Sequence, residues 1–219
     1  MNNYFVFIQK NQNEKLKELK VQHEEIKNSE DNFPDLFYSF IKEHRSNDQI
    51  TNRPYIQNLL SNIRQILYSF SEFKNTQEHF PDENEKGVSY EEIETAAALV
   101  FFFNAKSFLE IINKFTKFSI DQEFIQLQRS ITTIRDHFAH AYEKDTNDPS
   151  YPKAFVKIKI QRGLTELAVL EVTDQKTGSL ISEIHFSLDI FYFSLRDIFK
   201  KLKNNPKMFI KNPDRGIQK

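Results

Sequence analysis

The apolar residues of this chain recur mostly at helical spacing, and this feature limits its fold more than any other. Five of them follow one another at intervals of 4, 3, 4 and 3 residues: Leu127, Ile131, Ile134, Phe138 and Ala141. Such spacing places apolar side chains on one face of an α-helix. It also occurs over residues 54–73 and 188–202. The sequence therefore predicts a mainly α-helical protein.

Local signals predict where two of these helices begin. Pro54 follows the capping residue Thr51, and proline is favoured in the first turn of a helix. Ser89 and Glu92 have the spacing of a capping box, in which each side chain satisfies a backbone N–H of the other residue. The helix that starts there carries residues 96–103, which are apolar on every side. We expect it to be the central buried helix.

Before the last helix, the apolar residues recur at every second position instead of at helical spacing. Residues 155–160 alternate apolar and charged side chains, as a half-buried strand does. Two further strands are predicted at 164–172 and 180–186, and Gly178 lies in the connection between them. These segments predict a small antiparallel three-stranded β insertion, a β meander over residues 155–187.

Length and composition suit one domain over residues 1–219. The 22 Phe supply large apolar groups for a core, and the chain has no cysteine, which favours a reducing, cytoplasmic location. The longest apolar run, 96–103, is much shorter than the roughly 20 residues that cross a bilayer, so no membrane association is expected. The net charge is -1, but the region 196–219 holds eight Lys or Arg against two Asp, and residues 205–219 form a basic tail.

The segment RDHFAHAY, residues 135–142, is the candidate for chemistry. Asp136 and His140 are four residues apart on a predicted helix, so the carboxylate can orient the imidazole for general acid–base catalysis. Arg135 and Tyr142, seven residues apart, lie together on a flank of the same helix, and the arginine suits a phosphate. The alternative interpretation is a solvated, ion-paired helix face without function.

This segment resembles the signature of HEPN domains, in which four residues separate an Arg from a His and a polar residue follows the Arg. Tyr142 extends the resemblance to the Arg-x4-His-x-Tyr form of the HEPN toxins that are paired with nucleotidyltransferase antitoxins. The resemblance implies an HEPN-like helical bundle over residues 52–142 and 188–204. The β insertion and the polar N-terminal region depart from the compact toxin pattern.

What the resemblance implies is a metal-independent endoribonuclease, acting as a toxin or phage-defence effector without any cofactor. Its partners would be RNA, a second copy of the chain in a homodimer, and an antitoxin or regulatory protein. Arg135 would stabilise charge on the phosphate, and His140 would act as the acid or base toward the ribose 2′-hydroxyl. Asp136 would orient His140, and Tyr142 would contact substrate or be modified by a nucleotidyltransferase.

Other residues and other functions stay open at this point. His137 lies outside the family position and is a secondary candidate at the rim of the site. No metal site is expected, because no second histidine pair or carboxylate-rich helix accompanies the motif. His23, His44, His79 and His185 are isolated in the sequence and have no assigned role. Two alternatives to a ribonuclease are a noncatalytic HEPN-like module that binds RNA, nucleotide or protein, and a purely structural protein.

Overall fold

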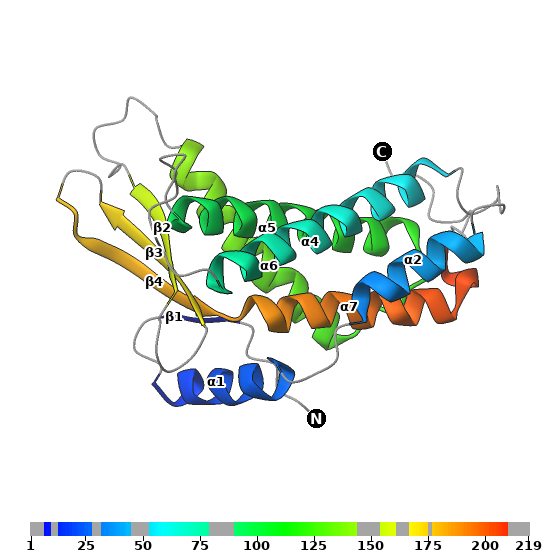
Figure 1. Ribbon diagram of the computed structural model, residues 1–219, viewed down its shortest axis with the longest axis horizontal. Helices are drawn as coiled ribbons and strands as arrows, with labels where there is room; N and C mark the ends of the chain where they lie inside the picture. The colour runs from blue at the N-terminus through cyan, green and yellow to red at the C-terminus, as the bar shows by residue number, and fades with distance from the viewer. Residues whose placement is uncertain are drawn as a thin grey trace.

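The fold is a bundle of helices with a small antiparallel sheet at one end (Figure 1). The computed structural model describes residues 7–9, 13–27, 32–44, 53–78, 90–143, 154–160, 167–174 and 177–209. Residues 81–87, whose polar, Pro- and Gly-containing sequence predicts a loop, lie outside this part of the chain. The predictions of a mainly helical chain and of a small antiparallel sheet before the last helix are confirmed.

Six α-helices are described: α1 (Asn13–Lys27), α2 (Phe33–His44), α4 (Pro54–Glu78), α5 (Tyr90–Phe115), α6 (Gln122–Glu143) and α7 (Leu188–Asn204). Helix α4 begins at Pro54, as predicted, but continues five residues beyond position 73. Its last turns still follow the helical spacing, since Phe73 and Thr76 are buried. Helix ends that lack a strong stop signal are poorly specified by local sequence.

Helix α5 packs between α4 and α6, and its Phe101, Phe102 and Phe108 are completely buried. These contacts agree with the prediction of a central buried helix, although Val100 and Phe103 on its open face are 37% and 39% exposed. By length and composition alone, its segment Glu92–Phe115 is apolar enough to cross a membrane, a test that the core helix of a soluble protein also passes. Half of its most apolar window is buried inside the protein.

The sheet contains the three predicted strands and one more. Strands β2 (Ala154–Ile160), β3 (Ala168–Asp174) and β4 (Leu180–Phe186) form an antiparallel meander, and β1 (Phe7–Gln9) pairs with β4 to give the order β1-β4-β3-β2. The sheet is therefore four-stranded among the described residues, whereas the sequence predicted three strands. Gly178, between β3 and β4, has a φ of 67°, a left-handed conformation that glycine adopts without steric cost.

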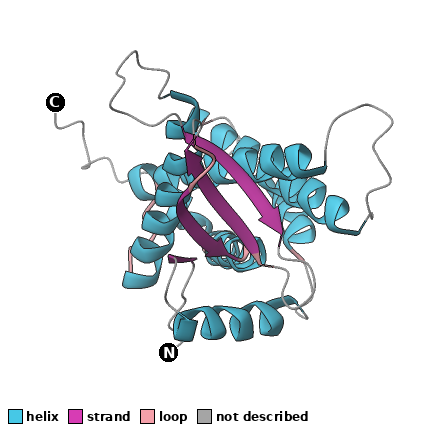
Figure 2. Cartoon of the chain, turned by 90° about the vertical axis from the view of Figure 1, so that its left-hand side faces the viewer, coloured by secondary structure: helices cyan, strands magenta, loops and turns pink. Residues whose placement is uncertain are grey.

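One face of the sheet covers the end of the bundle (Figure 2). Leu170, Ile184 and Phe186 alternate along β3 and β4 and are buried in the core. The Phe186 ring meets the Phe102 ring of α5 edge to face, with centroids 5.4 Å apart. The sheet and helices thus share one hydrophobic core.

Helix α7 forms the other wall of this core. Its aromatic residues Phe191, Tyr192 and Phe193 are buried, and the Tyr192 ring stacks on Phe70 of α4. The first residues of the basic tail are helical. Residues Pro206–Phe209 form a 3-10 helix, and Phe209 is buried because its ring packs against Phe40 of α2. The rest of the basic tail, from 210 to 219, lies outside the described residues.

Candidate functional site

The predicted site residues all belong to helix α6. The side chains of Arg135, Asp136 and His137 are described, and each is partly exposed. His140 and Tyr142 lie in the same helix by their backbone, but their side chains are outside the described part of the structure. The predicted hydrogen bond between Asp136 and His140 is therefore not among the contacts that the structure describes, and it stays a prediction.

The local sequence explains how α6 presents these side chains. The Asp121 carboxylate accepts a hydrogen bond of 2.8 Å from the Phe124 backbone N–H and so caps the helix N-terminus. Ile134 and Phe138 are completely buried, which fixes the rotation of the helix against the core. The residues between them consequently emerge at the edge of the α5–α6 contact.

Arg135 and Asp136 form an ion pair although they are neighbours in the sequence. The Arg135 Nη1 donates to the Asp136 Oδ1 over 2.8 Å. Consecutive helical residues point about 100° apart, so the long arginine side chain must bend toward the carboxylate. The guanidinium is thereby held in one direction, and part of its charge is compensated by Asp136.

The Phe103 ring of α5 packs against the Arg135 guanidinium. The guanidinium carbon lies 4.5 Å from the centre of the Phe103 ring, close enough for a cation–π interaction that stabilises by about 0.5–1 kcal/mol at an exposed site. The Arg135 Nε is buried and has no hydrogen-bond acceptor among the described residues. The arginine is therefore placed by an aromatic ring and a carboxylate, and one of its donors is left unused.

Lys106 of α5 adds a second cation that sequence reasoning missed. Its Nζ lies 3.9 Å from the Asp136 Oδ1, the same oxygen that accepts from Arg135. Lys106 lies 29 positions before Arg135 in the sequence, so no local pattern could have joined the two residues. Two positive side chains from two helices thus face one carboxylate oxygen.

His137 is oriented by its own helix. Its Nδ1 forms a hydrogen bond of 2.8 Å with the Thr133 backbone carbonyl, and the side chain is partly exposed. This carbonyl accepts only from an N–H, so the Nδ1 carries the proton and the Nε2 is the acceptor if the ring is neutral. The ring contacts none of the ionic groups of Arg135, Asp136 and Lys106 in the described residues.

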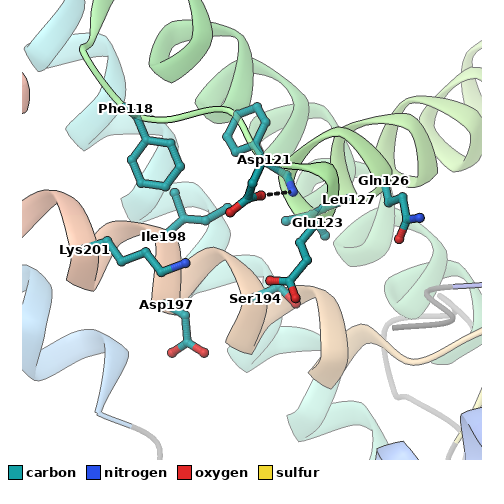
Figure 3. Close-up of a pocket in the computed structure, with 10 residues that line it drawn as sticks. Phe118, Asp121, Glu123, Gln126, Leu127, Ser194, Asp197, Ile198 and Lys201 are labelled. Atoms are coloured by element: carbon teal, nitrogen blue, oxygen red, sulfur yellow. Dashed lines mark hydrogen bonds between the residues drawn. The ribbon is translucent and has the colours of Figure 1, made fainter. Parts of the chain in front are cut away.

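A separate pocket of about 240 Å³ lies between the start of α6 and the second half of α7 (Figure 3). Its walls carry the carboxylates of Asp121, Glu123 and Asp197 and the amine of Lys201. Three carboxylates against one lysine would repel a phosphate group. This pocket is therefore a poor site for nucleic acid.

A second polar cluster is buried where β4 meets α7. The His23 Nδ1 of α1 forms a hydrogen bond of 2.7 Å with the Ser187 Oγ, and the Asp189 Oδ2 lies 3.8 Å from the same nitrogen. The Lys74 Nζ of α4 lies 3.2 Å from the Asp189 Oδ1. Serine, histidine and aspartate suggest nucleophilic catalysis, but His23 and Ser187 are completely buried and Ser187 caps α7. The cluster is structural.

Two histidines that appeared isolated in the sequence therefore have partners. His23 joins α1 to the start of α7, and His185 pairs with the Glu183 carboxylate on the outer face of β4. Among the residues that the structure describes, no three His, Cys, Asp or Glu side chains gather as metal ligands would. The group around Arg135 differs from the pocket and from the buried cluster in that two cations, Arg135 and Lys106, face a single carboxylate and are both partly exposed.

Comparisons of the chain with protein-family models, with curated proteins and with solved structures found no match. No homologous protein therefore supplies a function or a set of active-site residues for this chain. The motif on α6 and the contacts of its side chains are the features of the chain that bear on its function.

Proposed function

We propose that this protein is a metal-independent endoribonuclease of the HEPN type, with a role as a toxin or phage-defence effector. One observation carries the proposal. The Arg135 guanidinium is held at a partly exposed position over Phe103, next to a second cation at Lys106. Cations fixed in this way suit the charge that develops on a phosphate during cleavage.

The proposed chemistry uses the 2′-hydroxyl of RNA as the nucleophile. His140 removes the proton from this hydroxyl or donates one to the leaving 5′-oxygen, and Arg135 stabilises the negative charge on the phosphate. Both residues lie in α6, five positions apart, so one helix carries both roles. A second copy of the motif supplies the remaining acid or base in the proposed homodimer.

An exposed apolar face next to the motif supports the proposed homodimer. Tyr68 of α4 is 63% exposed, and together with Val100 it lines a shallow groove between α4 and α5. Phe103, one turn after Val100, lies between this groove and Arg135. Two copies related by a two-fold axis through Tyr68 and Val100 would cover these two side chains, leave Phe103 open at the edge of the contact, and bring two Arg135 residues near each other.

The proposed chemistry predicts that the purified protein cleaves RNA but not DNA of the same sequence, and that EDTA leaves the rate unchanged. DNA lacks the 2′-hydroxyl nucleophile, and no metal takes part in the proposed steps. Gel analysis of labelled oligonucleotides would measure both rates, and the products should carry 2′,3′-cyclic phosphates. An RNA with a single 2′-deoxy residue at the cut position is the matched control and should stay intact. Cleavage of DNA, or loss of activity in EDTA, would contradict the mechanism.

The proposed dimer predicts that Val100→Glu produces a monomer with at least a tenfold loss of RNA cleavage. A carboxylate buried against the second copy would lack a partner and would cost several kcal/mol. Analytical ultracentrifugation would give the mass. Val21→Glu is the control, because Val21 is 58% exposed on α1 and lies outside the groove between α4 and α5. It adds the same charge and should leave the mass of the dimer unchanged. A Val100→Glu protein with wild-type mass and activity would exclude this face.

The second candidate function is a noncatalytic HEPN-like module that binds RNA, nucleotide or a protein partner at the same residues. The ion pair between Arg135 and Asp136 favours it, because the pair lowers the charge that Arg135 offers to a transition state. A protein that binds RNA through Arg135 but never cleaves it would match this function.

A further inference from the structure

The position of the Asp136 carboxylate marks an anion site between two cations. Its Oδ1 lies 2.8 Å from the Arg135 Nη1 and 3.9 Å from the Lys106 Nζ. A phosphate oxygen carries a similar charge and accepts hydrogen bonds from the same two donors. The geometry that holds this carboxylate would therefore hold a phosphate that replaced it.

We infer that Lys106 is a second RNA-binding residue of the site, and that Asp136 occupies in the free protein the place of an RNA phosphate between Lys106 and Arg135. This inference rests on the proposed function and deepens it. Binding of RNA exchanges an internal ion pair for two contacts to the substrate. Asp136 then competes with the substrate, which differs from the role of orienting His140 that the sequence suggested.

The Arg135 guanidinium suits this exchange. The Asp136 carboxylate, on the adjacent residue, accepts from Nη1 only. The Nε is buried, which leaves the two Nη nitrogens for a substrate. A phosphate in the place of Asp136 can accept from both of them, in the bidentate arrangement that arginine favours.

Phe103 adds a second element of RNA recognition. Its ring is 39% exposed, and the Arg135 guanidinium already covers part of it. Aromatic rings and arginine planes at a protein surface are common stacking platforms for unpaired bases. An exposed ring beside two cations therefore fits a single-stranded substrate better than a duplex.

The test measures RNA binding in variants of the dimer that also carry His140→Ala, so that the substrate stays intact. Lys106→Met removes the charge but keeps the aliphatic part of the side chain. It should raise the Kd for a fluorescent single-stranded RNA about fivefold near 0.1 M salt and lower the slope of log K against log salt by about 0.7, the value for one lost phosphate contact on a single strand. Lys114→Met, on an exposed position of the same helix, is the matched control and should change neither.

Asp136→Asn separates the two roles of the aspartate. Removal of a competing carboxylate should lower the Kd for RNA about fivefold or more, measured in the same background. An unchanged Kd together with a fall in the cleavage rate of the protein that keeps His140 would assign Asp136 to orienting His140 and overturn its role as a competitor.

Failure of this inference is distinguishable from failure of the proposed function. If Lys106→Met binds RNA as Lys114→Met does, while Arg135→Ala still abolishes cleavage, the inference is wrong and the ribonuclease stands. If the wild-type protein neither binds nor cleaves RNA, both are wrong. Weaker binding of Lys106→Met with a smaller salt slope supports the inference.

Discussion

Replacement of Arg135 or His140 by alanine is expected to lower the rate of RNA cleavage by at least about a thousandfold. Removal of a group that stabilises charge on the reacting oxygens costs 10²–10³-fold in other enzymes, and a general acid or base contributes about 10²–10⁴-fold. Both effects fall on the chemical step, so kcat should fall more than KM rises. Initial rates on labelled RNA in EDTA measure the loss.

Arg135→Lys is the graded control for the arginine. It keeps a positive charge near Asp136 but loses the planar fork that binds two phosphate oxygens, so the rate should lie between those of wild type and Arg135→Ala. Arg135→Ala should lower the free energy of unfolding by no more than about 1 kcal/mol, because the partly exposed side chain loses its contact with Phe103 and its ion pair with Asp136. Full activity in both alanine variants would contradict the ribonuclease proposal, whether or not Lys106→Met binds RNA more weakly.

Mixing of the two inactive alanine variants tests the shared site. In a groove built from two copies, a mixed dimer keeps one Arg135 and one His140, and part of the activity should return. A site contained within one chain would stay inactive in every mixture. The result therefore distinguishes a site built from two copies from a site within one chain, and it requires no substitution in the dimer interface.

Phe102→Ala is expected to destabilise the protein by about 3–5 kcal/mol, the typical cost of deleting a completely buried phenylalanine. The Phe102 ring contacts Phe138 of α6, Phe186 of β4 and Phe191 of α7, with centroid distances of 6.2, 5.4 and 5.1 Å. The cavity would therefore weaken the junction of three elements. Urea denaturation followed by circular dichroism would measure the change in the free energy of unfolding.

Phe103→Ala is the matched control, because the two residues are adjacent in α5 and differ mainly in burial. Phe103 is 39% exposed, so its removal should cost about 1–2 kcal/mol at most, including the contact with Arg135. If the inference on RNA binding is right, Phe103→Ala should still weaken binding more than Phe102→Ala does under conditions where both variants are folded. Equal losses of stability would contradict the burial assigned to Phe102.

The sequence by itself determined the elements whose causes are local. Pro54 starts α4, Gly178 has the positive φ of a turn, and the alternating apolar residues of β4 end at Phe186, as predicted. The helical spacing over residues 188–202 also predicted α7, because it decides which of its side chains share a face. These features depend on hydrogen bonds and side chains within a few residues of one another.

The sequence also singled out the segment 135–142, but not its partners. Only the tertiary structure placed Lys106 and Phe103 of α5 beside Arg135, and it turned Arg135 toward Asp136. It also left one face of α5 exposed, although the apolar pattern suggested burial on all sides. Contacts between residues far apart in the chain depend on how helices pack, which no local pattern encodes.

Elsewhere in the fold, too, the contacts that the sequence did not predict join residues far apart in the chain. Strand β1 pairs with β4 almost 180 positions later, and His23 reaches Ser187 across 164 positions. The sequence alone did not indicate that the first strand pairs with β4 or that His23 contacts Ser187. The type of each element was therefore set by local periodicity and capping, whereas the surroundings of Arg135, and with them the proposed phosphate site, were set by the packing of α5 against α6.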